Sequence, residues 1–140
     1  MSSAVFSSRY RSYSWQVVGV VAVAGLSLLA WFAWLGWDQE YHVDPSTGVA
    51  SGPYEVWQVA GCALSLLVLL LGALMLRLSP VSTSAALTLA FTAVWTVDAA
   101  SSETTGLYGV GTLMLLVGLA SATAVVSVAF LHLRAAARSR

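Results

Sequence analysis

The stretch WDQEYHVDPSTGVASGPYEVW, residues 37–57, separates two strongly apolar parts of the chain. It holds four of the six acidic residues, one of the two histidines and two of the three prolines, and it contains no arginine. The segments on both sides of it are apolar and long enough to cross a bilayer. We therefore interpret residues 37–56 as a polar loop that connects membrane-spanning segments.

The composition supports this interpretation for the whole chain of 140 residues, a length that fits one domain. Hydrophobic residues make up 59 % of the sequence and charged residues only 9 %, whereas a soluble domain has about 25 % charged residues. All basic residues are arginine, a bias typical of a GC-rich bacterial coding sequence. The lone cysteine, Cys62, lies in an apolar run and belongs to no CxxC motif, so it predicts neither a disulfide nor a metal site.

Four segments have the length of a membrane-spanning helix, which needs about 20 apolar residues to cross roughly 30 Å of hydrocarbon. They cover residues 15–36, 57–76, 81–100 and 107–131, and Asp98 is the one charged residue within them. The first is longer than the roughly 7–15 apolar residues of a signal peptide, so we expect it to be retained. Backbone groups in lipid must be satisfied within each segment. The sequence thus predicts an all-α integral membrane protein, a single domain 1–140 folded as an up-down-up-down four-helix bundle.

The charges are sorted between the two sides of this bundle. All six arginines fall on one side and the loop acids on the other; the arginines are Arg9, Arg11, Arg77, Arg134, Arg138 and Arg140. The positive-inside rule then places both termini in the cytoplasm. We therefore expect a multi-pass protein of a bacterial plasma (inner) membrane, with the 37–56 loop outside and a short hairpin compatible with its turn residues.

Several residues mark the predicted helix ends. Glu55 lies at the start of the second helix, where an acid favours the positive end of the helix dipole. Pro80 fits the first turn of the third helix, and Gly106 permits a tight turn before the fourth. Trp31 and Trp34 lie near the predicted outer interface, where indole rings commonly anchor a helix at headgroup level.

Small residues recur at positions where helices could approach closely. Gly61 and Ser65 are four residues apart in the second span, Gly19 lies in the first span, and Gly111 and Gly118 lie in the fourth. Such residues allow close packing of helices in lipid. Their spacing leaves two alternatives open, an internal core or a contact with another membrane protein or a second copy of the chain.

The loop contains one pattern compatible with a metal ion. Asp38, Glu40, His42 and Asp44 alternate, so an extended backbone would place them on one face. Three carboxylates and an imidazole could bind a divalent metal. The alternative is a solvated acidic edge, because the spacing matches no established metal motif. No other cofactor is predicted.

The third span contains the one carboxylate within the predicted spans. A charged residue inside a membrane is commonly functional, and Thr88, Thr92 and Thr96 form a hydroxyl stripe on the same helix as Asp98. An ion or proton path is one interpretation. The alternative is that the threonines bond their own helix carbonyls and that Asp98 reaches water at the nearby interface.

The remaining patterns favour a non-enzymatic protein. The sequence contains no GxSxG, HExxH or Gly-rich phosphate loop, and no basic domain for nucleic acid. Arg134, Arg138 and Arg140 could contact anionic lipid headgroups, or they could serve only as the orientation signal. Our first hypothesis is an accessory or interaction protein that presents the 37–56 loop. The alternatives are a small transporter or channel using Asp98 and its threonine stripe, and a divalent-metal-sensing loop.

Overall fold

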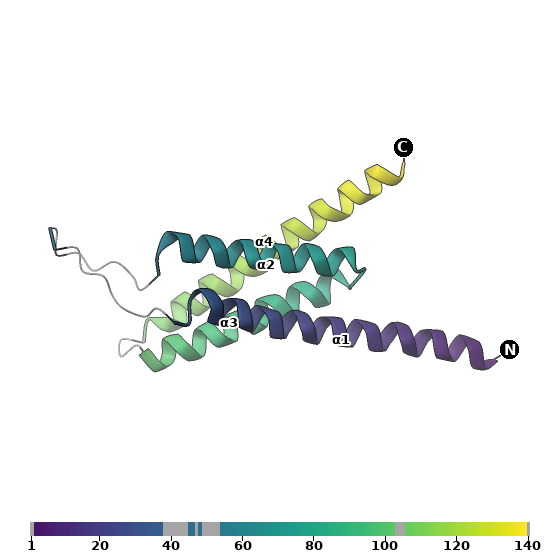
Figure 1. The fold of residues 1–140 in the computed structure, drawn as a ribbon, viewed down its shortest axis with the longest axis horizontal. Helices are drawn as coiled ribbons and strands as arrows, with labels where there is room; N and C mark the ends of the chain where they lie inside the picture. The colour runs from purple at the N-terminus through teal and green to yellow at the C-terminus, as the bar shows by residue number, and fades with distance from the viewer. Residues whose placement is uncertain (1, 38–44, 47, 49–53, 103–105, 140) are drawn as a thin grey trace.

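The structure, a computed structural model, contains four long helices and describes residues 2–37, 45, 46, 48, 54–102 and 106–139, with side chains from residue 13 onward. The helices are α1 (Ser2–Trp34), α2 (Val56–Met75), α3 (Pro80–Ser102) and α4 (Tyr108–Arg138). Successive helices run in opposite directions (Figure 1). The described residues contain no strand. The all-α, up-down-up-down architecture predicted from the sequence is confirmed.

Each helix contains a segment long and apolar enough to span a membrane, and all four match predicted spans. Two helices extend further than the apolar runs. α1 begins at Ser2, and α4 continues to Arg138 through a run of three alanines between two arginines. Alanine and arginine are strong helix formers, so α4 has no local reason to end where its apolar run ends.

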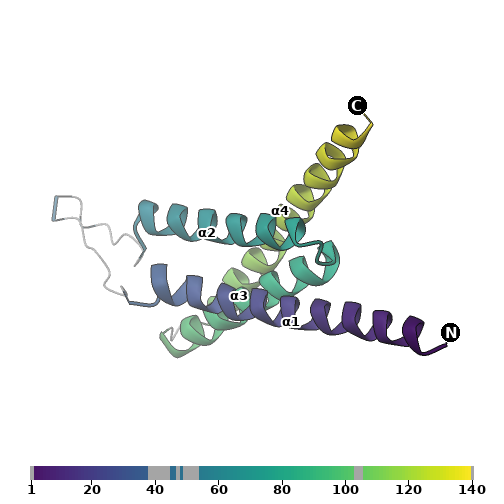
Figure 2. The ribbon, with the colours of Figure 1, turned by 45° about the vertical axis from the view of Figure 1, so that its right-hand side comes forward.

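The four helices do not close into a symmetric bundle. α3 contacts each of the other three helices, whereas α1 and α4 make no contact in the described part of the chain. Figures 1 and 2 show α4 crossing the other helices and leaving them toward its C-terminal end. The core therefore lies among α1, α2 and α3, with buried side chains such as Val23, Leu70 and Leu87.

Most of the apolar surface outside this core is uncovered. In the spanning part of α4 the buried side chains are Thr123 and Ser127, and the other three helices also expose many large apolar residues. An exposed apolar surface of this kind suits lipid, because hydrocarbon solvates it as well as a protein core would. The chain thus folds as a membrane protein with a small internal core.

The link between α2 and α3 closes with a Schellman motif. The N–H of Leu78 donates to the carbonyl of Ala73 at 3.1 Å, and the N–H of Arg77 donates to the carbonyl of Leu74 at 3.1 Å. Arg77 has a φ of 61°, a left-handed conformation that glycine adopts more easily than arginine. α3 begins at Pro80 as predicted, and Gly106, with a φ of 74°, precedes α4 as expected for a tight turn.

The Gln16 side chain of α1 forms two hydrogen bonds to the backbone of this link. Its Nε2 donates to the carbonyl of Arg77 at 3.0 Å, and its Oε1 accepts from the N–H of Ser79 at 2.9 Å. One amide side chain therefore satisfies two backbone groups that the turn leaves outside a helix. This end of the bundle, which carries Arg77 and Arg134, is called the basic end below. The opposite end, which carries Glu55 and Asp98, is called the acidic end.

Candidate functional site: a tryptophan clamp beneath the polar loop

Trp34, the last residue of α1, packs into a notch in α2. Its Nε1 donates to the Oγ of Ser65 at 3.0 Å, and that hydroxyl in turn donates to the carbonyl of Gly61 at 2.9 Å. A Cβ added at Gly61 would lie 2.5–2.8 Å from atoms of the Trp34 ring. The notch thus requires a glycine. The two small residues predicted to permit close packing here serve the internal core.

A second tryptophan joins the same cluster from the first turn of α2. The rings of Trp34 and Trp57 lie 6.1 Å apart at 72°, an edge-to-face arrangement that aromatic pairs favour. Trp57 also donates from Nε1 to the Glu55 carboxylate. The residues that flank the 37–56 loop are therefore tied to each other. We call Trp34, Trp57, Gly61 and Ser65 the tryptophan clamp.

Glu55 and Gln58 fix the start of α2 at the clamp. The N–H of Glu55 donates to the Oε1 of Gln58 at 2.7 Å, and the Gln58 side chain is completely buried. This hydrogen bond, from the N-cap N–H to the side chain three residues later, is one half of a capping box. Unwinding the start of α2 would therefore expose the buried Gln58 amide. The expected position of Glu55 at the helix start is confirmed, since α2 begins at Val56. The spacing Glu55-x-x-Gln58 is the sequence signal for this cap.

Two aromatic residues lie deeper than the sequence predicts. Trp31 is only 3 % exposed, and its Nε1 has no hydrogen-bond partner in the described structure. Trp34 is partly buried in the notch described above. Interfacial anchoring therefore fits Trp37 and Trp57, which are exposed, better than it fits these two residues. The difference arises because Trp31 lies on the buried stripe of α1 that also carries Val23 and Ser27.

The predicted transport residues occupy two environments on α3. Thr88 and Thr92 are buried, and their hydroxyls have no hydrogen-bond partner in the described structure. The hydroxyl of Thr96 lies 2.7 Å from the carbonyl of Thr92 and 3.0 Å from the hydroxyl of Thr112 on α4. The alternative that the threonines bond carbonyls of their own helix is therefore confirmed for Thr96. It is wrong for Thr88 and Thr92.

Asp98 is partly buried near the acidic end of α3. Its backbone carbonyl accepts hydrogen bonds from the hydroxyls of Ser101 and Ser102 at 2.7 and 2.9 Å. These bonds add two side-chain donors to a carbonyl in the last turns of α3, which ends at Ser102. A role of Asp98 in transport stays a prediction.

The basic end places one predicted lipid-contacting arginine against α2. Arg134 reaches the carbonyl of Leu74 with Nη1 at 3.5 Å, and its guanidinium carbon lies 5.9 Å from the centre of the Phe130 ring. Arg138 is exposed in the last turn of α4. Arg140 lies outside the described residues. Contact of these arginines with headgroups stays a prediction.

The predicted metal residues Asp38, Glu40, His42 and Asp44, and most of the proposed hairpin around them, also lie outside the described residues. In the part of the chain that the structure describes, no group of three or more His, Cys, Asp or Glu side chains could hold a metal ion.

No protein-family model, curated protein or solved structure matches this chain. The functional argument therefore depends on the residues of the chain itself. The two best-defined features are the tryptophan clamp at the acidic end and the Gln16-supported link at the basic end.

Proposed function

We propose that this integral membrane protein is a non-enzymatic accessory protein of a bacterial plasma membrane that presents its 37–56 loop to another protein outside the cytoplasm. The tryptophan clamp carries this proposal. It ties the last residue of α1 to the first turns of α2, so both ends of the loop leave from one fixed place. A loop whose ends are fixed loses less conformational entropy when a partner binds it, which favours recognition.

The chemistry of the loop suits a partner outside the hydrocarbon. It carries Asp38, Glu40, Asp44 and Glu55 and no arginine, so its partner would present basic or hydrogen-bonding groups. The arginine distribution supports an orientation with both termini in the cytoplasm. Accessibility of a reporter fused after Arg140, compared with one inserted at Ser46, tests this orientation. A C-terminal reporter accessible from outside the cell would contradict it.

Affinity purification from native membranes in a mild detergent tests the interaction. We expect a partner that copurifies with the wild-type chain and is lost when residues 38–52 are replaced by a Gly/Ser sequence of equal length. Arg138→Gln, at the opposite end of the chain, is the control and should retain the partner. Recovery of the chain always alone would contradict the proposal. Equal recovery of the partner with the replaced loop would also contradict it.

The unpaired hydroxyls of Thr88 and Thr92 favour one alternative function, a small transporter or channel. Buried hydroxyls without partners could exchange hydrogen bonds with a passing ion or water, and Asp98 lies on the same helix. Flux into liposomes that contain the purified protein tests this alternative. It predicts flux that Asp98→Asn or Thr92→Val reduces and that Thr123→Val, on α4, leaves unchanged. Absence of flux, or flux that no α3 substitution affects, would eliminate it.

A further inference from the structure

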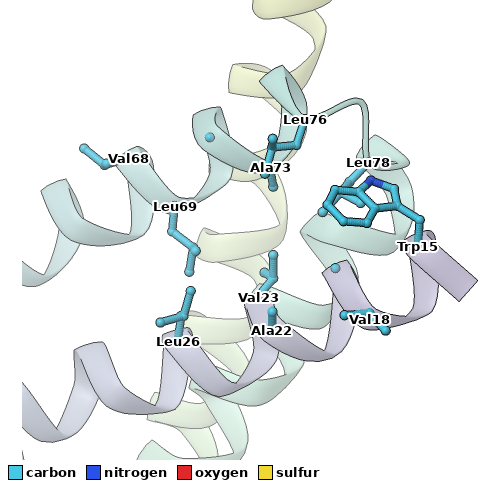
Figure 3. A pocket seen from close by; sticks show the side chains of 12 residues that line it. Trp15, Val18, Ala22, Val23, Leu26, Val68, Leu69, Ala73, Leu76 and Leu78 are labelled. Carbon is cyan, nitrogen blue, oxygen red and sulfur yellow. The ribbon is translucent and has the colours of Figure 1, made fainter.

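A groove of about 380 Å³ runs between α1 and α2 toward the basic end (Figure 3). Its size is within the roughly 300–1,000 Å³ of typical ligand sites. Apart from Leu76 and Leu78, its lining residues lie within the candidate membrane spans of both helices, so hydrocarbon surrounds most of the groove. Its walls are apolar and include Val18, Ala22 and Leu26 from α1 and Val68, Leu69 and Gly72 from α2.

Gly72 makes the groove deep on the α2 side. No side chain, and no backbone atom beyond the adjoining turns of α2, lies within 4 Å of the position that a Cβ would occupy at this residue. By contrast, a Cβ at Gly61, on the same helix, would collide with Trp34. The two glycines of α2 therefore have different surroundings. Gly61 is covered by the Trp34 ring of α1, whereas Gly72 leaves open space in the groove. A linear alkyl chain has the shape and polarity to occupy such space.

The basic end of the groove adds a charge to this apolar surface. Trp15, Leu76 and Leu78 line the groove together at this end (Figure 3), and Arg77 lies between the two leucines in the chain. The Arg77 side chain is exposed, and its guanidinium forms no ion pair with any described residue. An apolar groove that ends at a link with an exposed arginine complements an acyl chain joined to an anionic headgroup.

The backbone of Arg77 is held in place at this position. Its left-handed φ of 61° is the conformation for which glycine would be the usual residue, and its carbonyl is bonded by Gln16 of α1. α1 and α2 thus jointly fix the backbone from which the Arg77 side chain extends, at the end of the groove between them. A non-glycine residue in a strained conformation points to a role for its side chain.

We propose that the groove between α1 and α2 binds one acyl chain of an anionic phospholipid, whose phosphate contacts Arg77. The lipid comes from the leaflet adjacent to the α2–α3 link. This site is separate from the loop-presenting end of the molecule, so it goes beyond the accessory function proposed above.

Native mass spectrometry of the full chain with dioleoyl phosphatidylglycerol or dioleoyl phosphatidylcholine tests the proposal. We expect the wild-type chain to retain one phosphatidylglycerol in preference to phosphatidylcholine. Gly72→Leu fills the groove and should lower retention of both lipids about fivefold or more, because the acyl chain loses its contacts. Arg77→Asn introduces a residue that tolerates the left-handed conformation. It should lower the ratio of bound phosphatidylglycerol to bound phosphatidylcholine about fivefold.

Two matched variants control for general effects. Gly118→Leu places the same side chain at another open glycine, on α4, and Arg9→Gln removes one arginine from the N-terminal part of α1. Both should retain phosphatidylglycerol as the wild type does. Equal losses in these controls, or unchanged retention in Gly72→Leu, would overturn the proposal. A wild-type dimer that binds no lipid would also overturn it, because a second copy would then fill the groove.

Folding is monitored in each variant by far-UV circular dichroism in the same detergent. If Gly72→Leu does not fold, Ala22→Leu fills the groove from α1 instead, and the same loss of both lipids is expected. Ala22 is exposed, so its enlargement does not disturb the core. Retention unchanged in a folded Ala22→Leu chain would overturn the proposal.

Discussion

The indole of Trp34 and the hydroxyl of Ser65 form a 3.0 Å hydrogen bond between α1 and α2, directly above a glycine that the ring covers. This contact combines a polar bond with close packing at one point. In a bilayer, both contributions stabilise helix association, whereas burial of apolar surface contributes little because lipid is equally apolar. The first hairpin is therefore expected to depend strongly on a few residues.

The hydrogen bond itself can be measured by a double-mutant cycle. Trp34→Phe and Ser65→Ala each remove one partner, and we expect a coupling free energy of about 0.6 kcal/mol between them, the typical value for a hydrogen bond between membrane helices. Reversible unfolding in mixed micelles with increasing dodecyl sulfate provides the free energies. Strict additivity of the two substitutions would show that the bond contributes nothing to stability.

The close packing of the Trp34 ring against Gly61 is expected to contribute more to stability than the hydrogen bond to Ser65. In Gly61→Ala the new methyl group meets the indole ring, and we expect a loss of about 1–3 kcal/mol in the free energy of unfolding. Gly25→Ala is the matched control, because a Cβ at Gly25 of α1 has no neighbour within 4 Å. The control should be neutral or slightly stabilising, since alanine is the better helix former. Equal losses of stability in the two variants would show that Trp34 does not pack against Gly61 as described.

Gln16 is expected to stabilise the α2–α3 link through two separate bonds. Gln16→Ala removes both, and we expect a loss of about 1–3 kcal/mol at roughly 0.5–1.5 kcal/mol for each bond. Gln16→Glu keeps the acceptor for the Ser79 N–H but places a carboxylate oxygen against the Arg77 carbonyl. Unfolding in mixed micelles would compare the variants, and a Gln16→Ala chain as stable as the wild type would contradict this role.

The conformation of Arg77 can be tested apart from its charge. Arg77→Gly and Arg77→Ala both remove the guanidinium, but only glycine adopts a φ of 61° without strain. We expect Arg77→Gly to be more stable than Arg77→Ala by about 1 kcal/mol, since the left-handed conformation costs roughly 1–2 kcal/mol for other residues. The free energies of unfolding of these two variants decide the point. Equal stability would mean that the turn differs from the one described.

The four helices could be predicted from the sequence because lipid imposes a simple requirement on the chain. About 20 apolar residues must be helical to cross it, and local β-propensity has no influence on that outcome. The helix ends were predictable at Pro80 and Gly106 for another reason. Proline fits the first turn of a helix, and glycine adopts the positive φ of the turn before α4. The continuation of α4 to Arg138 was missed, because the end of an apolar run does not determine the end of a helix.

The sites were harder to predict because they depend on how the helices turn toward one another. Gly61 and Ser65 were found as a packing motif, but the residue that fills it, Trp34, depends on the rotation of α1 about its axis. The same rotation buries Trp31. Gln16 carried a signal in the sequence, an amide within an apolar span, yet its partners lie more than 60 residues away.

Within the described residues α1 and α4 make no contact, and this has a mechanical consequence. The apolar part of α4, residues 108–131, is about 36 Å long at 1.5 Å per residue, whereas the hydrocarbon core is roughly 30 Å thick. A helix longer than the bilayer adjusts by tilting. α1 is tied to α2 and to the α2–α3 link, but α4 leans mainly on α3. When membrane thickness changes, we therefore expect α4 to reorient while the first hairpin keeps its shape.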